Sequence, residues 1–151
     1  MSGRFAILTT AEIALVATTA KTVAQLITAT NVPILITGWG IFFDGISSTA
    51  EPIQVRLVKQ TTAIGGTPTT NNPVKINGQG TLQATGTIYG GSPTEPTITD
   101  TLDLAEIHPQ SGYEVKYPSD QYIELDGGSR CGIEATAPAN VNARIKIFFK
   151  E

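Results

Sequence analysis

The stretch NVNARIKIFFK, residues Asn140–Lys150, alternates apolar and polar side chains with a period of two. This is the period of a β-strand, in which successive side chains point to opposite faces of the sheet. One face is polar and charged, and the other is formed by Val141, Ala143, Ile145, Ile147 and Phe149. The stretch therefore predicts a strand buried on one side and exposed to water on the other.

Further stretches have the same character. Ile53–Gln60 repeats the alternation, and Pro33–Asp44, PILITGWGIFFD, is typical of a long strand. Its two glycines beside Trp39 predict a bend, because glycine inside a strand marks a bulge or a close backbone approach. Turn residues such as Gly90–Pro93 and Asp126–Gly128 separate the remaining candidates. The other candidate strands are Phe5–Thr9, Ile13–Thr18, Thr22–Thr30, Gly80–Tyr89, Leu102–His108, Gly112–Tyr117, Gln121–Leu125 and Cys131–Thr136.

Composition supports a β-rich fold. Thr, Ile and Val account for 22, 17 and 8 of the 151 residues, and β-branched side chains suit a pleated sheet better than a helix. Ala11–Thr30 has some helix-forming residues in its first half, but its five threonines favour strands. The spacing of eight to ten short strands predicts an all-β chain with one antiparallel β-sandwich, jelly-roll-like in type. We expect residues 1–30 to form N-terminal strands or an arm, and residues 31–151 to form the β-sandwich.

Several classes of function are disfavoured. No apolar run approaches the ~18 residues of a membrane span, and a net charge of −3 argues against electrostatic binding of nucleic acid. One Cys and one His are too few for a zinc site of the usual kind, so we expect no metal and no cofactor. The N-terminal residues lack the pattern of a secretory signal, which favours synthesis and folding in a cytoplasm.

Catalytic candidates are few. His108 is either a general base or a structural histidine at a strand end, and Cys131 beside Arg130 is either an activated thiol or a small buried residue. Asp100, Asp103 and Glu106 do not follow a calcium-loop spacing. A carboxylate-pair hydrolase remains an alternative. The structural interpretations are favoured, and we expect a protein that is not an enzyme.

Charge and aromatic residues point instead to binding. Residues 95–134 carry nine acidic and two basic side chains, so acidic and basic regions either segregate on the surface or mix. An aromatic side chain on the polar face of a strand, such as Phe148, is a candidate interface anchor or a covered core residue. The candidate interface residues are Trp39, Phe42, His108, Tyr113, Tyr117 and Phe148.

A resemblance to a known group of proteins suggests a more specific function. HPQSGYEVKYP (His108–Pro118) and YIELDGGSRCGIEATAPANVNARIKIFF (Tyr122–Phe149), with the upstream IFFDGISSTAEPIQVRLVKQTT between Gly40 and Thr62, resemble small all-β virion structural proteins of tailed bacteriophages. The similarity covers roughly residues 33 to 150 and is one of pattern. It implies a capsid decoration or cement protein that assembles in the host cytoplasm. Such a protein sits on the outer capsid, often as a homotrimer, and bridges major capsid protein subunits.

Two alternatives remain beside this expectation. The first is a glycan- or receptor-binding β-sandwich domain of a phage tail fibre or tail tip, in which Tyr113 and Tyr117 stack on sugar rings. The second is the carboxylate-pair hydrolase.

Overall fold

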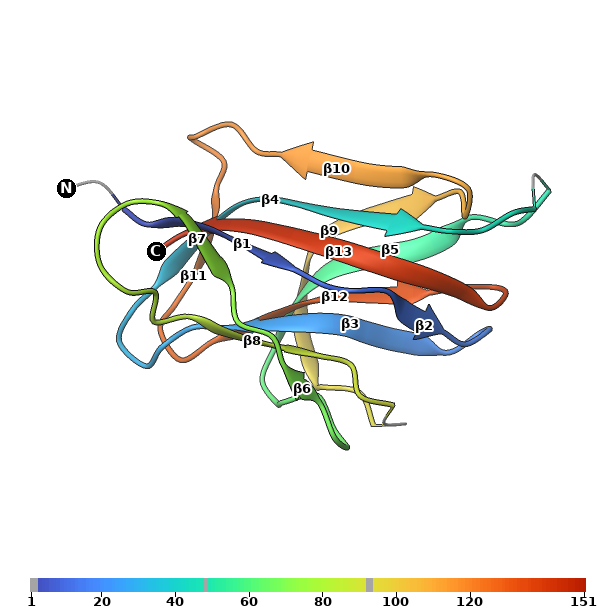
Figure 1. Cartoon of the computed structure of the whole chain (residues 1–151), viewed down its shortest axis with the longest axis horizontal. Helices are drawn as coiled ribbons and strands as arrows, with labels where there is room; N and C mark the ends of the chain where they lie inside the picture. Colours follow the sequence, from blue (N-terminus) through green and yellow to red (C-terminus); the bar gives the residue numbers. More distant parts are fainter. Residues whose placement is uncertain (1–2, 48, 92–93) are drawn as a thin grey trace.

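Two antiparallel sheets pack face to face as a β-sandwich (Figure 1). The computed structural model describes residues 3–47, 49–91 and 94–151, so Ser92 and Pro93 of the expected Gly90–Pro93 turn lie outside the described residues. The predicted fold class, an all-β antiparallel sandwich, is confirmed. Within these ranges no helix is long and apolar enough to cross a membrane.

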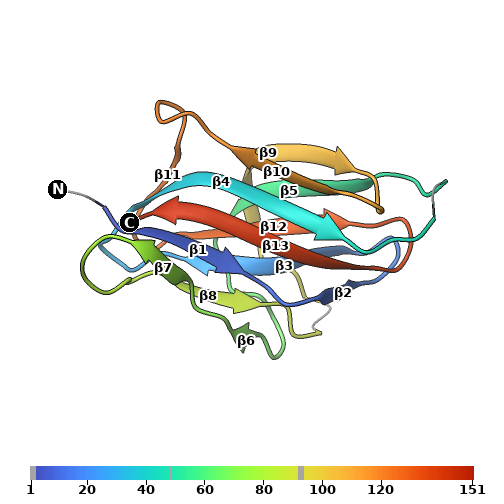
Figure 2. The same ribbon diagram turned by 45° about the horizontal axis from the view of Figure 1, so that its top comes forward.

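The first sheet, sheet 1, has the strand order β10-β4-β13-β1-β7, with β11 also beside β4 and β2 also beside β13. Figure 2 shows β4, β13, β1 and β7 side by side in this sheet. Its strands are β1 (Phe5–Thr9), β2 (Ile13–Leu15), β4 (Ile34–Phe43), β7 (Val74–Asn77), β10 (Gly112–Lys116), β11 (Ile123–Leu125) and β13 (Val141–Lys150).

The second sheet, sheet 2, has the strand order β6-β8-β3-β12-β5-β9. Its strands are β3 (Ala20–Ile27), β5 (Ile53–Gln60), β6 (Thr69–Thr70), β8 (Thr85–Ile88), β9 (Ile98–Ile107) and β12 (Arg130–Thr136). The strands β2 and β3 cover most of Ala11–Thr30, which confirms the strand interpretation of that stretch.

The connections follow the jelly-roll pattern. The strands β1 and β2 lie end to end along β13, and β10 and β11 lie end to end along β4, so each pair acts as one interrupted strand. Counted in this way, the chain has eight main strands, which alternate between the two sheets except where β5 is followed by β9. The short strands β6, β7 and β8 belong to the long connection between β5 and β9. The described residues form thirteen segments where eight to ten strands are predicted. Each of the eleven candidate stretches overlaps one of them, and β6 and β7 in the long connection are additional.

The core lies between the sheets. The apolar row predicted in Asn140–Lys150 faces inward: Ala143, Ile145, Ile147 and Phe149 are at most 1% exposed. Each large side chain buried in this way stabilises the fold by roughly 1.5–3 kcal/mol. The other face of β13 is then free to carry polar and aromatic residues.

The outer side of sheet 2 contains a second buried region, which is polar. Gln25 Nε2 donates to Gln60 Oε1 (2.7 Å) and to the Thr62 carbonyl (2.9 Å), and Gln60 Nε2 donates to Thr22 Oγ1 (2.9 Å). Gly132 provides the room for this network, because a Cβ atom there would lie 2.6 Å from Gln60 Oε1. The loop that follows β5 therefore covers this side of the sheet.

Residues near the two ends of the chain pair with each other. Arg4 N donates to the Glu151 carbonyl (2.9 Å), and Glu151 N donates to the Arg4 carbonyl (2.8 Å). The Arg4 guanidinium also forms an ion pair with the Glu151 carboxylate (2.7 Å), whose oxygens accept hydrogen bonds from the backbone N–H groups of Gln83 and Ala84. Figure 1 places this end of the sandwich opposite the loop between β4 and β5.

Candidate protein-interaction surfaces

The outward side of sheet 1 combines phenylalanine rings with lysines. Because alternate residues of β1, β4, β10 and β13 point into the core, the residues between them point outward. Phe148 lies opposite Ile7 of β1 and Gly38 of β4, near the middle of the sheet. We call this surface the Phe–Lys face, and it is formed by Phe5, Phe42, Lys116, Lys146, Phe148 and Lys150.

Each ring of the Phe–Lys face lies near at least one ammonium group. Lys116 Nζ is 4.8 Å from the centroid of Phe148, and Lys146 Nζ is 5.0 Å from that of Phe42. Lys150 Nζ is 5.5 Å from the centroid of Phe5. Such cation–π contacts contribute about 0.5–1 kcal/mol each at exposed sites and hold the lysine stems along the rings. The face therefore presents apolar area and positive charge together.

Acidic residues interrupt this basic surface at two points. Glu114 of β10 forms an ion pair with Lys146 at 3.0 Å, and both side chains are partly exposed. Glu124 of β11 is exposed near the end of the sheet, opposite Leu35. Arg144 continues the basic row along β13 and is exposed. The face is therefore mainly basic, with Glu114 as a negative charge among the lysines.

Glycines bring β10 close to β4 under this face. A Cβ atom on Gly38 would lie 2.5 Å from the Val115 carbonyl oxygen, and one on Gly112 would lie 2.1 Å from the Phe42 ring. The pairing of β13 with β4 also shifts register between Phe148 and Phe149, opposite Thr37. The bulge and the close backbone approach, from which a bend beside Trp39 is predicted, are thus both present.

Trp39, Tyr113 and Tyr117 lie together at the edge of the sandwich, beneath the Phe–Lys face. Trp39 is fully buried, and its Nε1 donates to Asp103 Oδ2 and to Tyr117 Oη, both at 2.9 Å. The Tyr117 hydroxyl donates to the same carboxylate. The Tyr113 ring packs against Trp39, with 5.3 Å between the ring centroids. Burial, followed by the neighbouring Asp103 carboxylate, raises the pKa of Tyr117 far above its ordinary value. These rings hold the two sheets together.

The catalytic candidates of the sequence are buried or form hydrogen bonds within the fold. His108 is half-buried in the turn between β9 and β10, where its Nδ1 accepts a hydrogen bond from Gln110 N (3.1 Å). Cys131 is fully buried, and burial raises the pKa of its thiol to about 12. Arg130 donates to Gln25 Oε1 (3.0 Å). Among the described residues, no three His, Cys, Asp or Glu side chains are grouped so that they could hold a metal ion.

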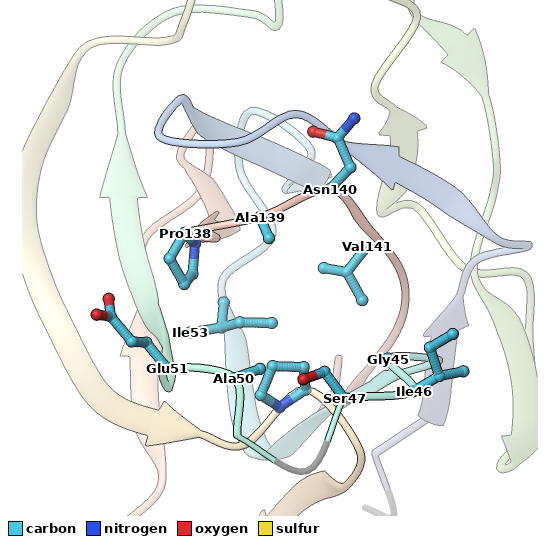
Figure 3. A pocket seen from close by; sticks show the side chains of 11 residues that line it. Gly45, Ile46, Ser47, Ala50, Glu51, Ile53, Pro138, Ala139, Asn140 and Val141 are labelled. Carbon is cyan, nitrogen blue, oxygen red and sulfur yellow. The ribbon is translucent and has the colours of Figure 1, made fainter.

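A pocket of about 420 Å³ opens at one end of the sandwich, and we call it the loop-end pocket (Figure 3). It lies between the β4–β5 loop, the β9–β10 turn and the β12–β13 loop. Its walls are mostly apolar, and Ile46 at its rim is 94% exposed. The main side chains around it are those of Ile46, Glu51, Ile53, Pro109, Pro138 and Val141.

Hydrogen bonds fix the loops around this pocket. Gly45 N donates to the Pro109 carbonyl (2.8 Å), and Gln110 Nε2 donates to the Ile46 carbonyl (3.1 Å). Asn140 Oδ1 accepts from Ala17 N (2.8 Å), which joins the β2–β3 loop to the β12–β13 loop. The pocket is therefore held open by bonds within the chain.

The structure separates the six candidate interface residues into three places. Phe42 and Phe148 lie on the Phe–Lys face, Trp39, Tyr113 and Tyr117 form the edge cluster, and His108 lies in the turn beside the loop-end pocket. The sequence pattern does not single out Phe5 or the pocket residues. Phe5 is separated in the chain from β13, and the pocket is assembled from three loops, so no local pattern identifies either.

Comparison with models of protein families gives no match, and comparison with curated proteins gives no significant match.

Proposed function

We propose that this chain is a virion structural protein, specifically a capsid decoration or cement protein of a tailed bacteriophage. In this role it assembles in the host cytoplasm, binds the outer capsid through the Phe–Lys face and bridges neighbouring major capsid protein subunits. The observation that carries the proposal is that face: three phenylalanines and three lysines on the outer side of a continuous sheet.

The chemistry of the Phe–Lys face suits a protein partner. Aromatic rings supply large contact areas with few rotatable bonds, and phenylalanine is enriched in interfaces. The lysines favour a partner surface that carries carboxylates. The face is built on hydrogen-bonded strands, so little ordering is needed when a partner binds. A modest contact of this kind becomes strong when many copies cover a shell and each bridges two subunits.

The glycan-binding alternative receives less support. Stacking on a sugar requires an accessible ring, whereas Tyr113 packs against Trp39 and the Tyr117 hydroxyl is bonded to Asp103. The hydrolase alternative would need a pair of available carboxylates, yet Asp103 already accepts hydrogen bonds from Trp39 and Tyr117. We therefore propose a binding function without catalysis, in which no cofactor takes part.

Self-association is part of the proposal. A homo-oligomer, with a trimer favoured, would present several Phe–Lys faces at once and gain from multivalency. Sedimentation equilibrium of the purified chain gives its mass in solution directly. A trimeric mass agrees with this part of the proposal, and a monomeric mass over the accessible concentration range contradicts it.

The test of the function is binding to undecorated capsids assembled from the major capsid protein of the phage that encodes this chain. We expect the wild-type chain to co-sediment with the shells, to add density in electron micrographs and to raise their melting temperature. Phe148→Ala with Lys146→Glu should abolish binding, while Glu106→Lys, at an exposed position of β9 in sheet 2, should not. Each variant is first checked for folding by circular dichroism. Absence of wild-type binding, or equal binding by the double variant, would contradict the proposal.

A further inference from the structure

We infer that the loop-end pocket is a second protein-binding site, which takes an extended segment carrying a bulky apolar side chain next to a lysine or arginine. This inference concerns the opposite end of the fold from the chain termini and does not rest on the proposed function.

The apolar part of the ligand follows from the walls of the pocket. Ile53 is completely buried at its base, and Pro109, Pro138 and Val141 form the sides. A cavity of about 420 Å³ is within the range of ligand sites and has room for a large aliphatic or aromatic side chain. Ile46 at the rim adds apolar contact area, because nearly all of its side chain is exposed.

The charged part of the ligand follows from the rim. Glu51 is the charged residue that lines the pocket, it is exposed, and it belongs to none of the ion pairs formed by the described residues. Asp44, at the end of β4, adds negative charge, since hydrogen bonds from Asn142 lower the pKa of its carboxyl group. The described residues that line the pocket include neither lysine nor arginine, and Asp44 lies in a neighbouring hollow together with Glu12 and Arg144. A cationic partner is therefore complementary, and an acidic one is repelled.

A second copy of this chain fits the pocket less well than an extended segment. Two loop ends brought together would place acidic residues against acidic residues. The Phe–Lys face of another copy has the required residue types, but its central ring, Phe148, is half-buried and is covered by Lys116 and Lys146. An extended segment can insert one side chain and still place a cation near Glu51.

The test uses synthetic peptides and the folded chain, without capsids. The peptide acetyl-Gly-Lys-Leu-Lys-Gly-amide is titrated into ¹⁵N-labelled protein, and amide shifts are followed by NMR. We expect shifts confined to residues around the pocket, including Ile46, Glu51 and Val141. Replacing the peptide leucine with serine should weaken binding about tenfold, because the buried apolar area is lost. Replacing both lysines with glutamates should abolish the shifts.

Protein variants complete the test. Glu51→Lys should weaken binding of the lysine peptide about fivefold, as for a partly exposed charge contact, and Ala139→Trp should block it by filling the pocket. Glu124→Lys makes the same charge change on β11 and should leave the affinity unchanged. The fingerprint spectrum of each variant shows that it is folded.

Three results would overturn the inference: equal binding of the glutamate peptide, shifts centred away from the pocket, or unchanged binding by Ala139→Trp. A concentration-dependent dimer that Ala139→Trp dissociates would assign the pocket to a second copy and would also overturn it.

Discussion

The indole Nε1 of Trp39 donates a hydrogen bond to the Asp103 carboxylate at 2.9 Å and so joins the two sheets. Trp39 belongs to β4 of sheet 1, and Asp103 belongs to β9 at the edge of sheet 2. Because Tyr117 donates to the same carboxylate, one acidic side chain satisfies two donors from the opposite side of the sandwich. A hydrogen bond to a charged acceptor is stronger than a bond to a neutral acceptor. These two bonds therefore stabilise the contact between the sheets at this edge.

The first prediction concerns the pH dependence of stability. Tyr117 keeps its proton in the folded chain, since burial and Asp103 raise its pKa, whereas an unfolded tyrosine ionises near its ordinary value of 10.0. Its contribution is therefore fully present below pH 10 and is lost as pH rises above that value. Tyr117→Phe should be less stable than wild type by about 1–2 kcal/mol at pH 8 because it lacks the hydrogen bond. This difference should shrink above about pH 10.

Urea denaturation of both proteins between about pH 8 and pH 11 checks this prediction. The comparison cancels the titration of lysines and of the other tyrosines, which the two proteins share. A constant difference across the whole range would show that Tyr117 does not have a raised pKa.

The second prediction concerns Cys131. Its thiol is completely buried, and burial raises its pKa to about 12, so at pH 8 the folded chain holds almost no accessible thiolate. In the native protein, a chromogenic disulfide reagent should react with this thiol only as fast as the sandwich unfolds. In concentrated urea, where the chain is unfolded, the reaction should be immediate. Since Cys131 is the one cysteine of the chain, Cys131→Ala should remove the reaction under both conditions. Rapid reaction with the native protein would contradict the buried placement.

The third prediction concerns Gly132. An added methyl group would lie 2.6 Å from Gln60 Oε1 and 2.8 Å from Thr22 Cγ2, so Gly132→Ala should destabilise the fold by about 1–3 kcal/mol. Gln60→Ala should also be destabilising, because it leaves Gln25 Nε2 and Thr22 with fewer partners. The double variant should lose less than the sum of the two, since the main clash disappears with the amide. The urea midpoints of the three variants measure these losses of stability. If the losses of the two single variants add up to that of the double variant, the contact between residue 132 and Gln60 is contradicted.

The fourth prediction concerns the sign of one charge on the Phe–Lys face. If the partner is acidic, as proposed, Glu114→Gln should strengthen binding to capsids by a few-fold because it removes a negative charge from among the lysines. It should also steepen the dependence of binding on salt. Co-sedimentation at several salt concentrations measures both effects. Weaker binding by Glu114→Gln would mean that the partner at this face is basic or that Glu114 itself makes the contact.

Local pattern was enough to predict most of the strands. The alternation in Asn140–Lys150 predicts both the strand and its buried side, and the glycines beside Trp39 predict the irregularity of β4. Both signals depend on neighbouring residues alone. The strand count is less accurate, because no candidate stretch covers β6 and β7. Both are short and exposed on all their residues, so they lack the alternation of buried and exposed positions that marks a strand in the sequence.

The surfaces are harder to predict because they combine distant segments. Trp39 and Phe42 occur in the same strand, yet the first is fully buried and the second is on the outer face, and only the sheet pairing decides which side is covered. The partner of Trp39 is Asp103, which in the sequence is one of three neighbouring carboxylates, with Asp100 and Glu106, that follow no calcium-loop spacing. Likewise, the loop-end pocket requires three loops that the jelly-roll connections bring to one end.

The pairing of Arg4 with Glu151 makes the fold suitable as a display scaffold. Because both residues lie at one pole and the loop-end pocket lies at the other, cargo attached beside either residue would lie at the pole opposite the pocket. The short gap between these residues also permits a circular permutant, in which a peptide linker joins the old ends and new ends open in an exposed connection.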